Sequence, residues 1–152
     1  MIEIKLELEE INRALSTAYE RWSLSTRDKK KDSYTWTDGL MKHFYGCVGE
    51  MACAKYLDRY WSGHVNQYKG GKADIGMDIE VRHRIERDKD LIIEKNDPPN
   101  RVYVLTRGIP PDIEVVGWYS KEMVKKSHLK KMRFREVYCI PEPDLLDLKE
   151  IK

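Results

Sequence analysis

One amphipathic stretch, residues 39–60, constrains the fold more than any other part of this sequence. Its apolar residues recur at steps of three and four, the spacing that places side chains on one face of a helix; they are Leu40, Phe44, Cys47, Met51, Ala54 and Leu57. Gly46 and Gly49 lie inside the same stretch, although glycine within a helix costs about 1 kcal/mol relative to alanine. We therefore expect a helix with one buried face, approached closely by a neighbouring element at glycine.

Glu50 interrupts the apolar face of this expected helix. At about 100° per residue it lies only about 60° from the centre of the apolar stripe, so its carboxylate falls at the edge of the buried face. A carboxylate in that position needs a partner or a metal. Glu50 is therefore the first candidate functional residue.

Strands dominate the rest of the chain. Alternation over residues 2–8 predicts a half-buried strand, and a helical spacing of apolar residues follows in Ile11, Leu15, Ala18 and Trp22. Further strands are predicted at 64–68, 72–75, 79–85, 91–93, 101–106, 113–118 and 137–140. A helix is predicted to begin at Ser120, whose hydroxyl can cap it. Polar residues 25–38 predict a basic loop, which carries Arg27, Lys29, Lys30 and Lys31.

This order of elements predicts one domain of the α/β (α+β) class over residues 1–152, with a central mixed sheet flanked by helices. Its core is expected over residues 40–140, and residues 1–38 add the N-terminal strand, a helix and the basic loop. The length matches one domain, and the three widely spaced cysteines make a poor disulfide framework. No apolar run approaches the ~20 residues of a membrane span, and no secretory signal is recognisable. We expect a cytoplasmic protein without a membrane partner.

A second group of candidate functional residues surrounds a turn in the middle of the chain. Asp74 precedes the turn, and the strand that follows alternates so that Glu80, Arg82 and Arg84 share one face. A hairpin there would bring the carboxylates of Asp74 and Glu80 together, and converging carboxylates suit Mg²⁺, which prefers hard oxygen ligands. The alternative is an exposed charged face with cross-strand ion pairs. His83 points to the opposite face, where we expect a packed or surface histidine.

Taken in order, these segments resemble the PD-(D/E)XK nuclease superfamily, in the form carried by small phage or mobile-element proteins. The resemblance rests on the helix motif Gly46-x-x-Gly49-Glu50-x-Ala52-x-Ala54-Lys55-Tyr56-Leu57, on Asp74 in Ala73-Asp74-Ile75, and on Glu80-Val81-Arg82 at the place of the E-x-K tripeptide. Later segments resemble the family's core strand, Gly-Trp turn and closing segment: 103–105, 115–119, 138–141 and Leu145-Leu146. The likeness covers roughly residues 40–148.

The resemblance implies a restriction-endonuclease-like core and a metal-dependent DNA endonuclease that uses Mg²⁺ or Mn²⁺. It implies Asp74, Glu80 and the Val81 carbonyl as direct metal ligands, with Glu50 reaching the metal through water. The expected setting is the cytoplasm of a bacterium or of a phage-infected host cell. A homodimer stays open, because small nucleases of this type often dimerise to cut both strands.

Arg82 departs from the family pattern, which has lysine there. Arginine stays protonated and cannot act as a general base, although it can hold a phosphate and stabilise developing charge. Lys72, two residues before Asp74, is a possible substitute. The third alternative is that catalysis is weakened or lost, which would leave a DNA-binding module of the same fold. A phage accessory domain that binds another protein is a further alternative.

The net charge of +2 is no argument against DNA, because it averages over patches. Residues 121–136 contain seven Lys or Arg against two Glu, a local surplus of +5. Such a run is either a solvated face or a phosphate-binding surface, in which case binding would fall steeply with salt. The candidate DNA contacts are Arg84, Lys125, Lys126, Lys130, Lys131, Arg133 and Arg135.

Overall fold

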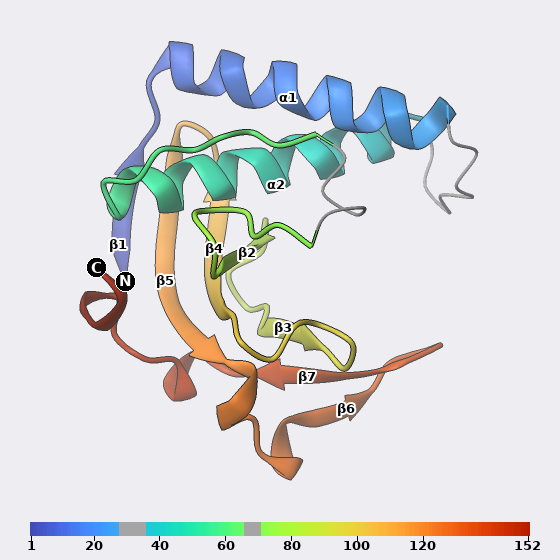
Figure 1. Ribbon diagram of the computed structural model, residues 1–152, viewed down its shortest axis with the longest axis vertical. Helices are drawn as coiled ribbons and strands as arrows, with labels where there is room; N and C mark the ends of the chain where they lie inside the picture. The colour runs from blue at the N-terminus through green and yellow to red at the C-terminus, as the bar shows by residue number, and fades with distance from the viewer. Residues whose placement is uncertain (28–35, 66–70) are drawn as a thin grey trace.

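Helix α2 (Trp36–Tyr56) packs across one face of a mixed sheet and is the central element of the fold (Figure 1). The structure is a computed structural model that describes residues 1–27, 36–65 and 71–152. Helix α1 (Leu8–Arg27) lies on the outer side of α2. The helix expected at 39–60 is thus confirmed, with bounds a few residues earlier.

The strands of the described residues form two sheets. The larger has four strands in the order β1-β5-β4-β2, comprising β1 (Ile2–Lys5), β5 (Asp112–Ser120), β4 (Val102–Ile109) and β2 (Ile79–Arg84). Among the described strands of this sheet, β2 and β4 pair in parallel and the other neighbours are antiparallel. The smaller antiparallel sheet has the order β3-β7-β6, comprising β3 (Leu91–Glu94), β7 (Glu136–Ile140) and β6 (Leu129–Lys131).

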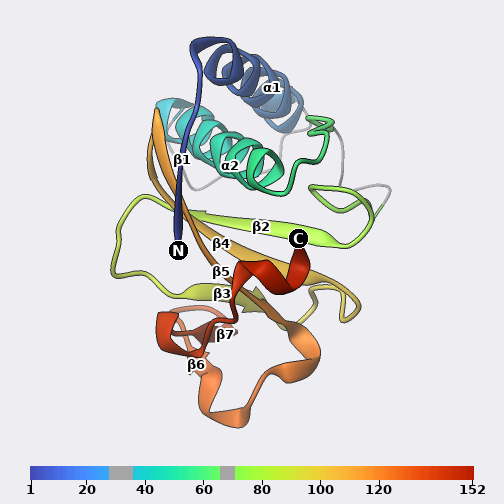
Figure 2. The ribbon, with the colours of Figure 1, turned by 90° about the vertical axis from the view of Figure 1, so that its left-hand side faces the viewer.

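The elements stack as layers, with α1 outermost, then α2, the larger sheet and the smaller sheet (Figure 2). One apolar core fills the space between the helices and the larger sheet and includes Val48, Ala52, Val81 and Val104. A second core lies between the sheets and includes Leu91, Tyr103 and Ile140. The chain is therefore a single α/β domain in which helices cover one face of the mixed sheet. The expected mixed sheet with helices packed against it is present, and the smaller antiparallel sheet covers its second face.

Gly49 marks the closest approach between α2 and the sheet. A Cβ atom built on Gly49 would lie 2.5 Å from Thr106 Oγ1 and 2.8 Å from His83 Nδ1. Around Gly46, one turn earlier, such an atom would meet nothing within 4 Å. The close packing that glycine indicated in this helix is thus found at Gly49 and not at Gly46.

Several other sequence-based expectations need correction. No helix starts at Ser120; two 3₁₀ turns, Lys121–Met123 and Lys126–His128, precede the unforeseen β6. The segment lacks apolar residues at helical spacing, so a helix there would have no face to bury. Leu15, expected on the buried face of the first helix, is 44% exposed, and Ala14 is buried instead.

The strand expected at 72–75 reduces to a single bridge between Ile75 and Ile79. The next N–H of β2 on that edge, Val81 N, donates to the Asp74 carboxylate rather than to a backbone carbonyl, so the ladder does not continue. Two expectations fall outside the described residues: the basic residues Lys29, Lys30 and Lys31, and most of the strand expected at 64–68. Within the described residues, no helix combines the length and apolarity needed to cross a lipid bilayer.

Candidate active site

The outer edge of β2 carries the candidate site. Strand β2 is the last strand of its sheet, and among the described residues its free side is flanked by the Ile75–Ile79 bridge alone. The Asp78 carbonyl accepts a hydrogen bond from Val102 N at 2.8 Å, so Asp78 turns its backbone toward β4. Backbone direction alternates along a strand, and the carbonyl of Val81 therefore faces the free edge.

Asp74 lies at this edge with an almost fully buried carboxylate. The residue is only 8% exposed, and its Oδ2 accepts a hydrogen bond from Val81 N at 2.7 Å. Burial, together with the negative charges of Glu50 and Glu80, raises the pKa of Asp74 well above its usual range. Among the described residues no cation forms an ion pair with Asp74. The Val81 N–H and the more distant charge of Arg82 favour its ionised form, but burial and the two neighbouring acids outweigh them.

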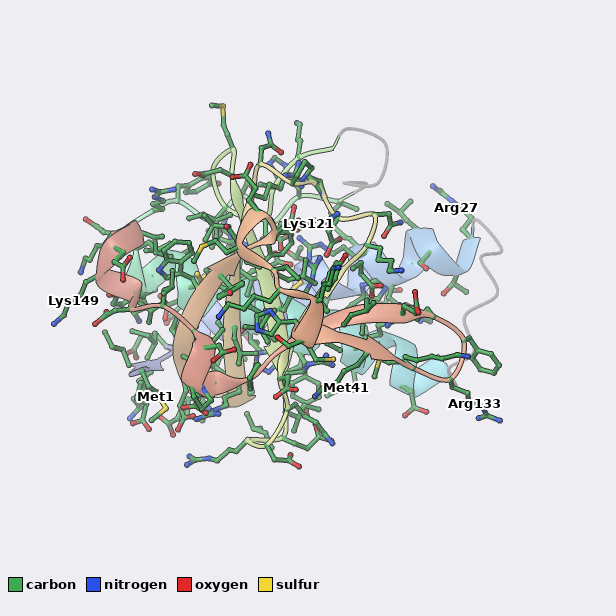
Figure 3. The ribbon with its side chains drawn as sticks, turned by 90° about the horizontal axis from the view of Figure 1, so that it is seen from below. Met1, Arg27, Met41, Lys121, Arg133 and Lys149 are labelled. Carbon is green, nitrogen blue, oxygen red and sulfur yellow. The ribbon has the colours of Figure 1, made fainter. Side chains whose placement is uncertain are left out.

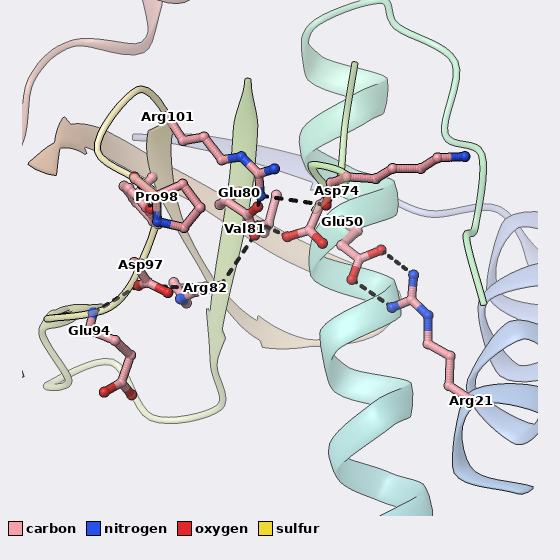
Figure 4. Close-up of polar contacts among 12 residues, drawn as sticks. Arg21, Glu50, Asp74, Glu80, Val81, Arg82, Glu94, Asp97, Pro98 and Arg101 are labelled. Atoms are coloured by element: carbon pink, nitrogen blue, oxygen red, sulfur yellow. Dashed lines mark hydrogen bonds and ion pairs between the residues drawn. The ribbon is translucent and has the colours of Figure 1, made fainter. Parts of the chain in front are cut away.

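The carboxylate of Glu80 is also buried, but two arginines form ion pairs with it. Arg101 Nη1 donates to Glu80 Oε1 in a very short ion pair, and Arg82 Nη1 lies 3.6 Å from Oε2 (Figure 4). Arg82 in turn pairs with Asp97 at 2.9 Å, and the backbone N–H of Glu94 donates to the same carboxylate at 2.8 Å. Ion pairs are present on this face, as the alternative expected, but their partners Asp97 and Arg101 lie in the segment between β3 and β4 rather than on a paired strand, and Glu80 is buried.

Glu50 approaches the site from α2, on the other side of Asp74. Arg21 of α1 binds both of its carboxylate oxygens, at 2.7 and 3.0 Å, and Trp61 Nε1 donates to it at 2.9 Å. Figure 4 shows Arg21 reaching Glu50 from one side while Arg101 reaches Glu80 from the other. A partner was expected for the Glu50 carboxylate at the edge of the buried face. It has two, the guanidinium of Arg21 and the indole N–H of Trp61.

Glu50, Asp74 and Glu80 share one neighbourhood without forming a ready metal-binding cluster. Across residues 1–27, 36–65 and 71–152, no group of three or more His, Cys, Asp or Glu side chains is close enough to hold a metal ion. The donor types nevertheless suit Mg²⁺ or Mn²⁺, since the Asp74 carboxylate and Val81 carbonyl are hard oxygen ligands at the same edge. Recruiting Glu80 as a further ligand requires it to leave Arg101.

The remaining residues predicted near the site have different surroundings. Lys72 is exposed, and its backbone carbonyl accepts a long contact of 3.5 Å from Arg101 Nη1. His83 packs under α2, with Nδ1 3.1 Å from Thr106 Oγ1 and Nε2 3.0 Å from the Gly108 carbonyl. Burial lowers the pKa of His83 to about 4, so it is neutral at physiological pH. The expectation of a packed histidine is confirmed.

The candidate DNA contacts of the basic segment are exposed along the 3₁₀ turns and the β6–β7 hairpin: Lys125, Lys126, Lys130, Lys131, Arg133 and Arg135. Two of them pair with acids of β3 and of the segment before it, Lys130 with Asp90 at 3.1 Å and Arg135 with Glu94 at 2.8 Å. Arg84 is half-buried, and its Nε has no hydrogen-bond partner among the described residues. Burial lowers the pKa of Arg84.

Sequence reasoning missed Arg21, Trp61, Asp97 and Arg101, which contact the predicted carboxylates directly or through Arg82. For Arg21 a signal existed, because it follows Ala14 and Ala18 at steps of four and three and so falls on the buried face of its helix. An arginine on a buried face predicts an acidic partner. Comparison of the chain with protein-family models, curated proteins and solved structures returned no match.

Proposed function

We propose that this chain is a metal-dependent DNA nuclease with a restriction-endonuclease-like core and with Asp74 at the centre of its active site. The observation that carries the proposal is the buried Asp74 carboxylate, which lies between Glu50 and Glu80 and forms no ion pair within the described residues. Burying a charge without compensation is costly, and a divalent cation would supply the compensation. The order of the motifs along the chain supports the same assignment.

Asp74, Glu80 and the carbonyl of Val81 would hold Mg²⁺ or Mn²⁺. An ion bound there would activate water and neutralise charge on a scissile phosphate. Glu50, fixed by Arg21 and Trp61, adds negative charge beside the ligands and would bind a metal-bound water. Of the alternatives for the missing lysine, Arg82 is the best placed, because Asp97 holds its guanidinium next to Glu80. Arg82 then contributes phosphate binding and charge stabilisation rather than proton abstraction.

A pair of aspartate variants tests the proposal. Asp74→Asn keeps an oxygen that can accept from Val81 N, whereas Asp78→Asn changes an exposed aspartate on the same turn. Supercoiled, single-stranded and branched DNA are incubated with Mg²⁺ or Mn²⁺. We expect Asp74→Asn to cleave at below about 1% of the original rate, since even loss of an outer-shell partner costs about 10–100-fold. Asp78→Asn should retain activity, and cleavage that survives Asp74→Asn contradicts the proposal.

The ion pairs of Glu80 favour a second candidate, a DNA-binding module of the same fold that does not cut. Arg82 and Arg101 already compensate Glu80, so a metal must compete with them for this carboxylate. Calorimetric titration with Mn²⁺ separates the two candidates. A nuclease should bind Mn²⁺ and should bind it more tightly after Arg101→Gln, which removes the competing cation. A non-catalytic module should bind no Mn²⁺ in either form and should bind DNA in a salt-sensitive manner.

A further inference from the structure

The β6–β7 hairpin ends in a turn whose two central residues are Arg133 and Phe134. Met132 N donates to the Arg135 carbonyl at 2.7 Å, and Arg135 N donates to the Met132 carbonyl at 3.3 Å, which closes the turn. Phe134 is 87% exposed. Figure 3 shows Arg133 at the outer end of this hairpin, which projects beyond the rest of the strands. The tip thus presents an aromatic ring to solvent.

The composition of this tip is unusual for a hairpin turn. Two-residue hairpin turns favour Asn, Asp and Gly, and a phenylalanine there leaves its apolar area in water. The Arg133 guanidinium carbon lies 5.2 Å from the centroid of the Phe134 ring, a cation–π contact between the two tip residues. Met132 is exposed beside them. The ring and the positive charge therefore form one surface feature.

The cations along the hairpin divide into two groups. Lys130 and Arg135 are neutralised by acids of the neighbouring strand and loop. Lys131 and Arg133 form no ion pair within the described residues and are exposed. An aromatic ring with unpaired cations around it is the combination by which proteins bind single-stranded nucleic acid, because bases stack on the ring and cations contact the phosphates.

A continuous series of contacts connects the hairpin to the candidate active site. Arg135 pairs with Glu94 at 2.8 Å, and the backbone N–H of Glu94 donates to Asp97 at 2.8 Å. Asp97 pairs with Arg82 at 2.9 Å, and Arg82 lies 3.6 Å from Glu80. The turn end of the hairpin, at Arg135, is therefore linked to the carboxylate site, as a substrate that spans both would require.

We propose that Phe134 stacks on an unpaired base of DNA while Lys131 and Arg133 bind the adjacent phosphates, so that the preferred substrate is single-stranded or locally unpaired DNA. This inference rests on the proposed function, and it specifies the substrate class. A closed duplex offers its bases only as stacked edges, so the ring has no partner there. A protein partner would also cover an exposed ring, but the unpaired cations beside it favour a polyanion.

Binding measured in EDTA tests the inference independently of catalysis. Fluorescein-labelled DNA of about 30 nucleotides is offered as a single strand, as a duplex, and as a duplex with one unpaired 2-aminopurine. Phe134→Leu keeps apolar bulk but removes the aromatic face, and Phe134→Trp keeps a face. The matched control is Tyr60→Leu, because Tyr60 is also exposed and also lies 5.2 Å beneath an arginine, Arg13.

We expect Phe134→Leu to weaken binding of the single strand by about 5- to 100-fold and to leave duplex binding unchanged. It should also abolish the change in 2-aminopurine fluorescence. Phe134→Trp and Tyr60→Leu should bind like the unsubstituted protein. Equal binding by Phe134→Leu, an equal loss in Tyr60→Leu, or binding of a protein but of no DNA overturns the inference. Absence of cleavage with intact Phe134-dependent binding overturns the proposed nuclease activity alone.

Discussion

Alanine at Gly49 and alanine at Gly46 should change stability in opposite directions. Both substitutions gain about 1 kcal/mol of helix propensity. At Gly46 nothing opposes that gain, because an added Cβ meets nothing within 4 Å. At Gly49 the Cβ would lie 2.5 Å from Thr106 Oγ1 and 2.9 Å from His83 Cβ, so that the sheet or the helix must shift. Overpacking of this kind costs about 1–3 kcal/mol.

The surroundings of Gly49 leave little room for relaxation. His83 is held by two hydrogen bonds and stacks on Tyr45 with ring centroids 6.1 Å apart. Displacing it from Thr106 adds about 1 kcal/mol for the lost hydrogen bond. We therefore expect Gly49→Ala to lower the free energy of unfolding by about 1–3 kcal/mol and Gly46→Ala to raise it by about 1 kcal/mol.

Urea denaturation followed by far-ultraviolet circular dichroism measures both effects, with the m-value checked for constancy. In thermal melts, 1 kcal/mol corresponds to about 2–4 °C for a chain of this size. If Gly49→Ala is as stable as Gly46→Ala, the contact between α2 and the β2–β4 pair is looser than described. The placement of Glu50 beside Asp74 would then be wrong as well, because this contact sets it.

Three further results are expected from buried groups. Burial and nearby acids raise the pKa of Asp74, so the folded protein loses stability as pH rises through that pKa and the carboxyl ionises. Asp74→Asn should therefore raise the free energy of unfolding of the metal-free protein at neutral pH. Urea melts across the acidic range should show this stabilisation by Asp74→Asn vanish on acidification. Arg21→Met should cost about 3–5 kcal/mol by leaving Glu50 buried and unpaired, and a second change of Glu50 to leucine should recover most of it in the same melts. Burial raises the thiol pKa of Cys47 and Cys53 to about 12, so neither should react with a disulfide reagent at pH 8 until the protein unfolds; rapid reaction would contradict their burial.

Local periodicity accounts for the parts of the fold that could be predicted. The apolar stripe of α2, the alternation in β2 and the apolar run of β4 each depend on neighbours a few residues away, and each was placed correctly within a few residues. The packing of His83 followed from the same alternation. The segment after Ser120 could not be predicted in this way, since its single turns and short strand are held by distant contacts such as His128 with Asp144 at 2.9 Å.

The sequence by itself identified Glu50, Asp74 and Glu80 as candidate functional acids. Helical spacing places Glu50 at the edge of a buried face, and the turn between Asp74 and Glu80 brings these two carboxylates toward each other. Only the tertiary structure decided how their charges are compensated. Arg21 is 29 residues from Glu50 and Arg101 is 21 residues from Glu80, and no local pattern connects such pairs. The same folding leaves Asp74 buried without an ion pair among the described residues. Helical and strand periods report which face a residue occupies, whereas ion pairing depends on which distant segments the packed layers bring into contact.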